Sequence, residues 1–203
     1  MLDYWNHNTA YHSELLDAVP SHTSHVLDIG CGDGLLLKKL AARTKHVTGI
    51  DTDASALSRA RARFSNPNEV QLILGDFLNT PELKMGRFDL ITCVASLHHM
   101  PLLPALERMR DLLAPGGELR VVGLSANKTI SDWIISGMVL VPIRLMSKAR
   151  RESGYPDMTT AQPSESFTEI RAAAATILPG SQVRRRVYYR YTIAWVKPLV
   201  NKE

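Results

Sequence analysis

Three glycines alternate with other residues in the stretch Val26–Leu37, which reads VLDIGCGDGLLL, and Asp28 stands two residues before the first of them. Gly30, Gly32 and Gly34 lie between an apolar run typical of a strand and a run with helical spacing. Glycine lets the backbone turn sharply and lets a ligand approach the main chain without a Cβ in the way. The free N–H groups and positive dipole of the following helix favour an anionic group. The aspartate would lie beside a cationic ligand group and would repel a pyrophosphate.

Two common phosphate-binding loops do not fit this spacing. A dinucleotide fingerprint requires a third glycine at the sixth position of G-x-G-x-x-G, where this chain has Leu35. A P-loop requires a Gly-Lys-Ser/Thr sequence, which does not follow here. A glycine-rich turn without a ligand is the alternative. Three glycines and an acid between a strand and a helix favour a binding loop over that alternative.

Further acids stand at the ends of the next two apolar runs. Asp51 ends the run VTGID, and a carboxylate at that place can accept two hydroxyls of a ribose. Asp53 is the competing candidate, and we interpret it as the N-cap of the helix that begins ASAL. Asp76 ends LILGD, where it could accept from an exocyclic amine while Phe77 packs near an adenine ring; alone, Asp76 would be a turn residue. Ligands bind outside the carboxyl ends of strands in open α/β sheets, so the acids together predict an adenosine site.

Alternating elements must position these acids. Strand-like runs occur at 25–30, 46–51, 70–76, 88–96 and 118–125, and helical runs at 35–43, 54–64 and 102–113. The alternation predicts an α/β fold, a parallel sheet with helices on both faces.

The last third of the chain has a different pattern. A helix is expected over 167–180, followed by a β-branched and aromatic run over 182–198 that is long enough for two strands. We predict a tight reversal near Tyr189–Tyr191, although that stretch lacks the usual Gly or Asn.

Composition and charge narrow the class of protein. The 203 residues fit one domain, and the net charge of +4 with a pI near 9.2 is only mildly basic, unlike a dedicated nucleic-acid binder. Cys31 and Cys93 have no CxxC partner or nearby His at ligand spacing, which argues against a disulfide or a zinc site and favours a reducing cytoplasm. The N-terminus has no apolar signal-peptide region, and no run is long enough to span a bilayer.

The strings VLDIGCGDG, VTGIDTD, LILGDF, FDLITCVASLHHM and LLAPGGELRVVG, taken together, resemble the class I S-adenosylmethionine-dependent methyltransferases in order and spacing. The resemblance covers about half of the chain, residues 26–124. It implies a Rossmann-like, doubly wound, seven-stranded sheet whose last strand is antiparallel, with S-adenosylmethionine as cofactor, S-adenosylhomocysteine as product and no metal. A ligand that carries both a sulfonium and a carboxylate agrees with an acid-lined loop beside a helix N-terminus. As one methyltransferase domain over 1–203, the chain would comprise an N-terminal helical cover (1–24), a cofactor-binding core (25–124), a substrate-side insertion (125–164) and a C-terminal helix and strands (165–203).

The resemblance also implies roles for single residues. Asp51 would take the ribose hydroxyls, Asp76 and Phe77 the adenine, and the glycine loop with Asp28 the methionine part. Two residues at the end of the fourth strand would lie along the cofactor. The expected cofactor-binding residues are Tyr11, Asp28, Gly30, Cys31, Gly32, Asp51, Thr52, Asp76, Phe77, Val94 and Ala95.

Two histidines are candidates for the catalytic base, and residues of the N-terminal segment are candidates for closing the site. His98 and His99 follow the fourth strand, and a histidine is the side chain whose ordinary pKa suits a general base near neutral pH. Similar histidine pairs in the family can be packing or positioning residues. The sequence does not show which of His98 and His99 would be the base. Tyr11 or His12 could close the site and exclude water; the alternative is a surface helix that packs its aromatic residues on the domain.

The apolar stretch from Ile130 to Met146 is expected to cover the substrate. Pro142 and Arg144 interrupt it, so it does not span a bilayer. It could be a helix packed on the core, a lid over an apolar pocket, or, with the basic residues beyond it, a segment that contacts a membrane surface. We hypothesise a lid with Trp133 and Met138 facing the substrate.

The acceptor is expected to be a small organic molecule, apolar or aromatic, methylated on oxygen, nitrogen or carbon. The Asp/Asn-Pro-Pro-Tyr/Phe motif of enzymes that methylate nucleobase amines or glutamine amides is absent, since this place reads ASLHHM. The chain resembles quinone-biosynthesis and secondary-metabolite enzymes more closely. The alternatives are a nucleotide-cofactor oxidoreductase, a non-catalytic module that keeps the cofactor site, and an RNA methyltransferase; oligomeric state is not predicted.

Overall fold

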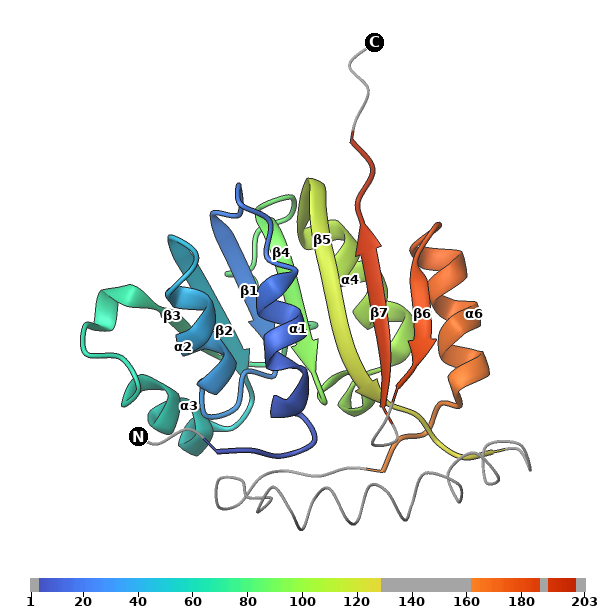
Figure 1. Cartoon of the computed structure of the whole chain (residues 1–203), viewed down its shortest axis with the longest axis horizontal. Coiled ribbons are helices and arrows are strands. Elements are labelled where there is room, and N and C mark those ends of the chain that lie inside the picture. The colour runs from blue at the N-terminus through green and yellow to red at the C-terminus, as the bar shows by residue number, and fades with distance from the viewer. Residues whose placement is uncertain (1–3, 129–161, 187–189, 200–203) are drawn as a thin grey trace.

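A single sheet of seven strands organises the computed structural model, which describes residues 4–128, 162–186 and 190–199 (Figure 1). The spatial order is β3-β2-β1-β4-β5-β7-β6, with β7 antiparallel to both of its neighbours and the other pairs parallel. The strands are β1 (His25–Ile29), β2 (His46–Asp51), β3 (Gln71–Leu74), β4 (Phe88–Val94), β5 (Leu113–Leu124), β6 (Gln182–Arg185) and β7 (Arg190–Val196). The expected seven-stranded sheet with an antiparallel last strand is therefore confirmed.

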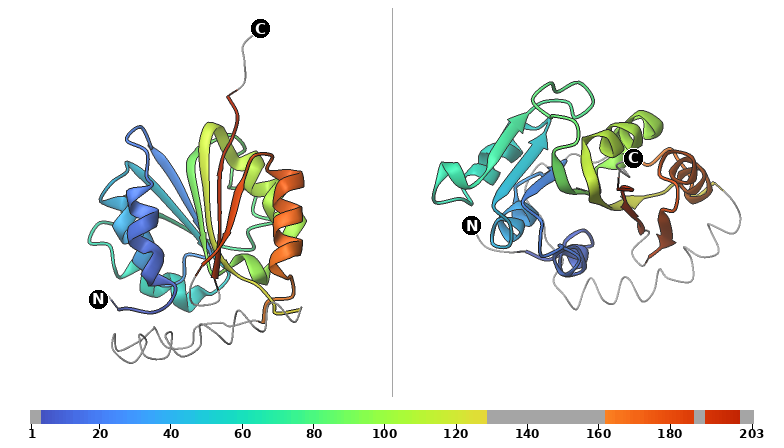
Figure 2. Two further views of the ribbon diagram at one scale, coloured as in Figure 1. Left: turned by 45° about the vertical axis from the view of Figure 1, so that its right-hand side comes forward. Right: turned by 90° about the horizontal axis from the view of Figure 1, so that it is seen from above.

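Helices cover both faces of this sheet (Figure 2). The elements are η1 (Thr9–Tyr11), α1 (His12–Asp17), α2 (Leu35–Ala41), α3 (Ala54–Arg61), η2 (Pro67–Glu69), η3 (Leu97–His99), α4 (Leu102–Leu112) and α6 (Phe167–Ile177). Side chains of α1, α2 and α3 share one buried apolar cluster, and those of α4 and α6 share a second. The strands contribute alternately to each, as in β1, where Val26 joins the first cluster and Leu27 the second.

Two expected boundaries differ from the structure. The reversal predicted near Tyr189–Tyr191 is misplaced, because β7 already begins at Arg190 and the N–H of Arg186 donates to the carbonyl of Arg190 at 2.8 Å. Tyr191 is a strand residue because its fully buried ring packs in the core with the alternate side chains of β7. The fifth strand begins at Leu113, not near 118, since the Pro-Gly-Gly backbone extends the pairing: the N–H of Gly116 donates to the carbonyl of Lys197 at 2.8 Å.

Candidate active site

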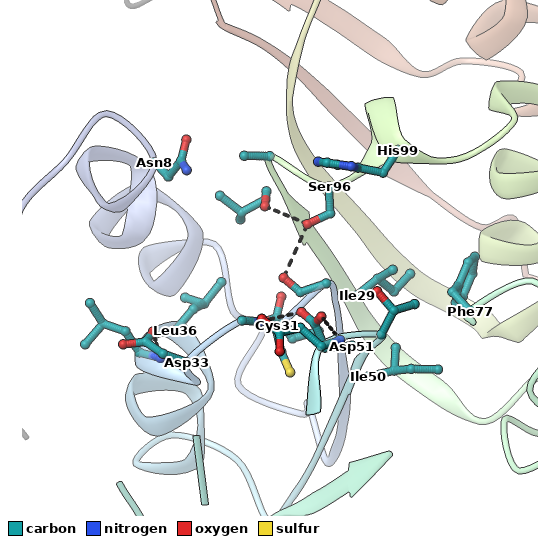
Figure 3. Close-up of a pocket in the computed structure, with 18 of the residues that line it drawn as sticks. Asn8, Ile29, Cys31, Asp33, Leu36, Ile50, Asp51, Phe77, Ser96 and His99 are labelled. Atoms are coloured by element: carbon teal, nitrogen blue, oxygen red, sulfur yellow. Dashed lines mark hydrogen bonds between the residues drawn. The ribbon is translucent and has the colours of Figure 1, made fainter. Parts of the chain in front are cut away.

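A cavity of about 400 Å³ opens at the carboxyl ends of β1, β2 and β4 (Figure 3). This size is at the lower end of the range for pockets that hold small molecules and cofactors. Its wall consists of the loops after β1, β2, β3 and β4 and of the segment before α1. The cavity is lined by Tyr4, Asn6, Asn8, Thr9, His12, Asp28, Ile29, Gly30, Cys31, Gly32, Asp33, Leu35, Leu36, Ile50, Asp51, Thr52, Asp53, Gly75, Asp76, Phe77, Val94, Ala95, Ser96, His99 and Met100.

The glycine loop forms one side of the cavity with three left-handed residues. The φ angles of Gly30, Gly32 and Gly34 are 66°, 54° and 75°, a conformation that side chains with a Cβ rarely adopt. A Cβ built on Gly30 would lie 2.1 Å from the Oγ of Ser96, so the loop after β1 can lie against the loop after β4 only with glycine there. The expected approach of a ligand to this loop stays a prediction, and the structure adds a second reason for the glycine, its contact with Ser96.

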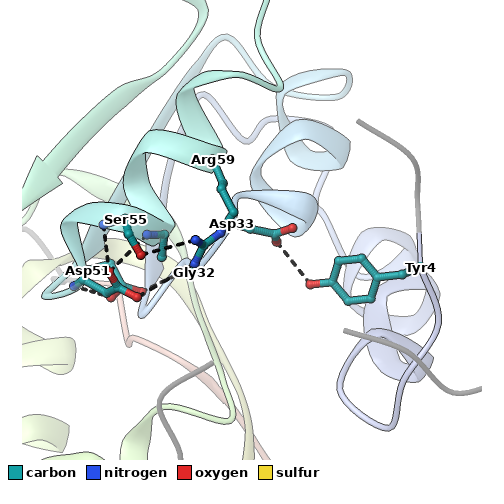
Figure 4. Close-up of polar contacts among 8 residues, drawn as sticks. Tyr4, Gly32, Asp33, Asp51, Ser55 and Arg59 are labelled. Carbon is teal, nitrogen blue, oxygen red and sulfur yellow. Dashed lines mark hydrogen bonds and ion pairs between the residues drawn. The ribbon is translucent and has the colours of Figure 1, made fainter. Parts of the chain in front are cut away.

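Asp51 joins the loops after β1 and β2 (Figure 4). One carboxylate oxygen accepts from the N–H of Gly32 at 2.8 Å, and the other accepts from the N–H of Asp53 at 2.9 Å. A carboxylate has about four acceptor positions, so about two remain for a ligand. Asp53 itself caps α3 by accepting from the N–H groups of Ser55 and Ala56, which confirms its interpretation as an N-cap.

Asp76 and Phe77 stand where the third strand ends. Asp76 is exposed at the cavity, and its carboxylate accepts from the N–H of Leu78 at 3.0 Å and from the side chain of Asn79. Asp76 is thus a turn residue as well as a lining residue. Phe77 is 4% exposed and belongs to the second apolar cluster, so its ring is held by packing at the cavity edge.

Asp28 is a buried carboxyl group at the floor of the cavity. Its side chain is 3% exposed, and one oxygen accepts from the hydroxyl of Thr92 at 2.7 Å. Burial raises the pKa of Asp28 to about 7, opposed by the Thr92 hydrogen bond and reinforced by the nearby charge of Asp51. The same burial, with Asp28 and Asp51 nearby, raises the pKa of the Cys31 thiol well above its ordinary value. Near neutral pH, Asp28 therefore lies close to the point at which it gains or loses its charge.

Asp33 and Ser96 also line the cavity, although the sequence did not single them out. Asp33 is 3% exposed and forms an ion pair with Arg63, which ties the glycine loop to the segment that follows α3. Asp33 also accepts from the Tyr4 hydroxyl at 3.1 Å, which ties the loop to the N-terminal segment (Figure 4). Its position inside the glycine motif was the available signal. Ser96 donates to the carbonyls of Gly30 and Val94, and Ala95 before it has a φ of 53°. No sequence pattern predicts this left-handed alanine at the end of β4.

The histidine pair divides between the cavity and its surroundings. His99 lines the cavity and faces it across from Asn8, whereas His98 is not among the lining residues (Figure 3). The two rings are tilted against each other with centroids 4.3 Å apart. The pKa of His98 falls to about 4, chiefly because of burial and then because of the charges of His99 and Arg190. Its buried Nδ1 has no hydrogen-bond partner among the described residues. His98 is thus neutral near pH 7.

The structure places other predicted residues outside the cavity or outside the described chain. Tyr11 is 5% exposed in the first apolar cluster, with the Arg186 guanidinium 5.7 Å from its ring centroid, and does not line the cavity. Burial raises its pKa, against the opposing charges of Arg186 and Arg190. The N-terminal segment still forms a cavity wall, through residues such as Asn8 and His12. Trp133 and Met138, the proposed lid residues, lie outside the described residues.

The cavity wall is strongly acidic. Five aspartates line it, and among the described residues no Lys or Arg does. Arg63 compensates one of these charges, Asp33, and Arg59 lies 3.9 Å from another, Asp53. The excess of carboxylates favours a ligand with positive charge and disfavours a pyrophosphate.

Metal clusters and membrane spans are both missing from the part of the chain that the structure describes. That part contains no group of three or more His, Cys, Asp or Glu side chains that could hold a metal ion. None of its helices combines the length and the apolar character needed to cross a bilayer.

Comparisons with known proteins converge on one class. A family model described as "Methyltransferase domain" matches residues 26–117. An "uncharacterized methyltransferase" of Mycobacterium tuberculosis is 36% identical over 198 residues, which is 96% of this chain and 98% of that protein. A "ubiquinone biosynthesis O-methyltransferase" of Marinobacter nauticus is 33% identical over 156 residues, covering 74% of this chain and 63% of that protein. The S-adenosylmethionine-bound amino pentose methyltransferase CalS10 of Micromonospora echinaspora has the same fold, with a TM-score of 0.63 at 17% identity over 95% of this chain and 92% of that one.

Proposed function

Because the chain belongs to the class I S-adenosylmethionine-dependent methyltransferases, we propose that its acidic cavity binds this cofactor and that the methyl group is transferred to a hydroxyl of a small, apolar or aromatic acceptor. The observation that carries the proposal is the placement of the predicted acids and glycines. Ten of the eleven predicted cofactor-binding residues line one cavity, with Tyr11 the exception.

The residues present fit such a cofactor. About two acceptor positions of Asp51 remain for the ribose hydroxyls, since its other two accept backbone N–H groups. Asp76 and Phe77 stand at the adenine end. The glycine loop and Asp28 face the methionine part, where the free N–H groups at the start of α2 suit a carboxylate and Asp28 suits a cation.

S-adenosylmethionine supplies an electrophilic methyl group on a positively charged sulfur. The protein's main task is alignment of donor and acceptor, which can be worth about 7–11 kcal/mol. A hydroxyl acceptor also has to lose a proton, and a positioned base contributes about 10²–10⁴-fold. We assign this role to His99, because it faces the cavity while His98 lies outside the lining. His98, neutral and packed against the ring of His99, would serve to orient it.

An oxygen acceptor is supported by the names of several relatives, which are ubiquinone biosynthesis O-methyltransferases. The imidazole of His99 at the cavity is compatible with a hydroxyl that must be deprotonated. The acceptor's chemical class is therefore proposed as phenol- or catechol-like.

Calorimetry and a transfer assay test the proposal in order. Saturable binding of S-adenosylhomocysteine, with no comparable binding of NAD(H), is expected first. Labelled methyl transfer from S-adenosylmethionine to a panel of phenols and catechols follows. The His99→Ala variant should lower the turnover number by about 10²–10⁴-fold and keep cofactor affinity, whereas His98→Ala should have a smaller effect. Absence of cofactor binding would disprove the proposal, and equal turnover of wild type and His99→Ala would remove the assigned base.

A further inference from the structure

The wall of the cavity before α1 is made by a short segment with its own local order. The side-chain oxygen of Asn6 accepts from the N–H groups of Asn8 and Thr9, at 3.0 and 2.9 Å, and the Thr9 hydroxyl accepts from the N–H of Asn6 at 2.9 Å. The helix that follows, α1, has only six residues. Helices this short are not stable by themselves, so the placement of this wall depends on contacts with the rest of the molecule.

The C-terminal hairpin supplies two of these contacts. Arg190, the first residue of β7, donates from its Nε and one terminal nitrogen to the side-chain oxygen of Asn8, at 3.2 and 2.6 Å, although the two residues are 182 positions apart. Arg186, just after β6, forms an ion pair with Glu14. Asn8, Tyr11 and Glu14 are spaced three apart, so one side of the η1–α1 segment meets both arginines. Figure 1 shows the start of β7 at the same edge of the sheet as the segment before α1.

Asn8 occupies a special place in this arrangement. It lines the cavity and also accepts both hydrogen bonds from Arg190, whereas Arg190 does not line the cavity. The hydrogen bonds to a charged guanidinium are stronger than neutral ones, and the fork of two donors fixes direction as well as distance. Because the N–H of Arg186 donates to the carbonyl of Arg190, the hairpin holds both arginines in one geometry.

We propose that Arg190 is a positioning residue that holds the N-terminal wall of the cofactor cavity in place through Asn8. This inference rests on the proposed function, because the cavity that this wall lines is the one proposed to bind S-adenosylmethionine. Arg190 does not line the cavity, so its proposed effect on the cofactor site is transmitted through Asn8, which does.

Variants of the full-length protein separate this role from general stability. Arg190→Ala should weaken S-adenosylhomocysteine binding roughly tenfold, since a hydrogen bond to a charged group is lost. Arg190→Lys should restore part of the affinity. In a double-mutant cycle, Asn8→Ala combined with Arg190→Ala should be little worse than either alone, because both changes remove the same interaction. Arg184→Ala is the matched control: this exposed arginine of β6 donates to Gln182 and lies away from the cavity.

Hydrogen exchange without any ligand tests the placement independently. Amides of residues 8–17 should exchange faster in Arg190→Ala than in wild type or Arg184→Ala, while those of β1 and β4 should not change. Equal exchange of residues 8–17 in all three proteins would overturn the inference. Additive effects of the Asn8 and Arg190 changes on cofactor affinity would overturn it too. Failure of the wild type to bind S-adenosylhomocysteine would instead overturn the proposed function.

Discussion

Asp51 has both a structural role, as acceptor of two backbone N–H groups, and a proposed functional role, as acceptor of the ribose hydroxyls. Replacing it with alanine removes the acceptors of two backbone N–H groups and of the proposed ribose hydroxyls. We expect Asp51→Ala to weaken S-adenosylhomocysteine binding by about 1–3 kcal/mol, the usual cost of leaving polar partners unmet. Titration calorimetry measures this change. Asp17→Asn is the control, because it removes the same charge from an exposed carboxylate that does not line the cavity. Unchanged affinity in Asp51→Ala would place the ribose elsewhere.

The buried Asp28 makes stability depend on pH. Its pKa rises from about 3.8 in the unfolded chain to about 7 in the folded protein, so the folded state holds this proton more tightly. Stability from this group is therefore full below about pH 4 and is lost as the pH rises through 7. The difference between the two pKa values corresponds to about 4 kcal/mol.

The Asp28→Asn variant isolates this effect, because it shares every other titrating group with the wild type. Without cofactor, urea unfolding should show that the free energy of unfolding of the variant, relative to wild type, increases between pH 5 and pH 8. The same variant should bind S-adenosylmethionine more weakly at pH 8, where it lacks the negative charge. A constant difference in unfolding free energy over this interval would show that Asp28 has an ordinary pKa.

Residues of the site were predictable where a motif fixes the backbone, and less so where tertiary packing decides. Asp51, Asp76 and the glycines lie at strand ends, so their convergence follows from a parallel sheet. Tyr11, at the end of η1, does not line the cavity. Helical spacing does not reveal which side of the short η1–α1 segment faces the cavity and which side packs in the core. Asp33 forms an ion pair with Arg63, thirty positions away, and no local sequence pattern predicts that ion pair.

At the scale of elements, α2 and α3 approach each other through Gly34. This residue precedes α2 with a φ of 75°, and a Cβ on it would lie 2.8 Å from the Cβ of Ala60 in α3. We expect Gly34→Ala to lower the free energy of unfolding by about 2–4 kcal/mol, from the left-handed conformation together with the overlap. Chemical denaturation measures the loss.

Gly86→Ala is the matched control for that substitution. Gly86 has a similar φ of 65°, but nothing lies within 4 Å of the position that a Cβ would take there. Its replacement should cost only the conformational part, about 1–2 kcal/mol. If both variants lose the same stability, the contact between α2 and α3 has no role and the backbone conformation alone explains the glycine.

Element order was predictable because strand and helix periods alternate along the chain, and α2 begins at Leu35 where the glycine loop ends. The boundaries that failed depend on backbone pairing across the sheet. A Pro-Gly-Gly sequence indicates a turn locally, yet Gly116 and Gly117 pair with Lys197 and so extend β5. The predicted position of the C-terminal turn differs from the structure for a related reason. Tyr191 belongs to β7 because its ring packs against core residues that are distant in the sequence, and a short stretch of sequence does not show those contacts.

For the whole molecule, net charge and site charge have opposite signs. The chain carries a formal charge of +4, while the described cavity wall has five aspartates and neither Lys nor Arg. Composition averages over the whole chain and does not show that negative charge is concentrated in the cavity. This concentration arises because the aspartates at the carboxyl ends of β1, β2 and β3 lie at one edge of the sheet. A cationic ligand therefore meets a local field that the overall charge conceals.

This separation predicts how salt should affect two ligands that differ mainly by one methyl group and one charge. S-adenosylmethionine carries a positive sulfur near the acids, whereas S-adenosylhomocysteine does not. Screening lengths shorten from about 10 Å at 0.1 M salt to about 3 Å at 1 M, so raising the salt should weaken S-adenosylmethionine binding several-fold and affect S-adenosylhomocysteine less. Calorimetric titrations of both ligands over that range measure the two slopes. At pH 8, where Asp28 is charged in the wild type, the slopes should move closer together in Asp28→Asn, because one of the attracting charges is gone. Identical slopes in the wild type would mean that the sulfur lies away from the acidic wall, and the orientation proposed for the cofactor would then have to be reversed.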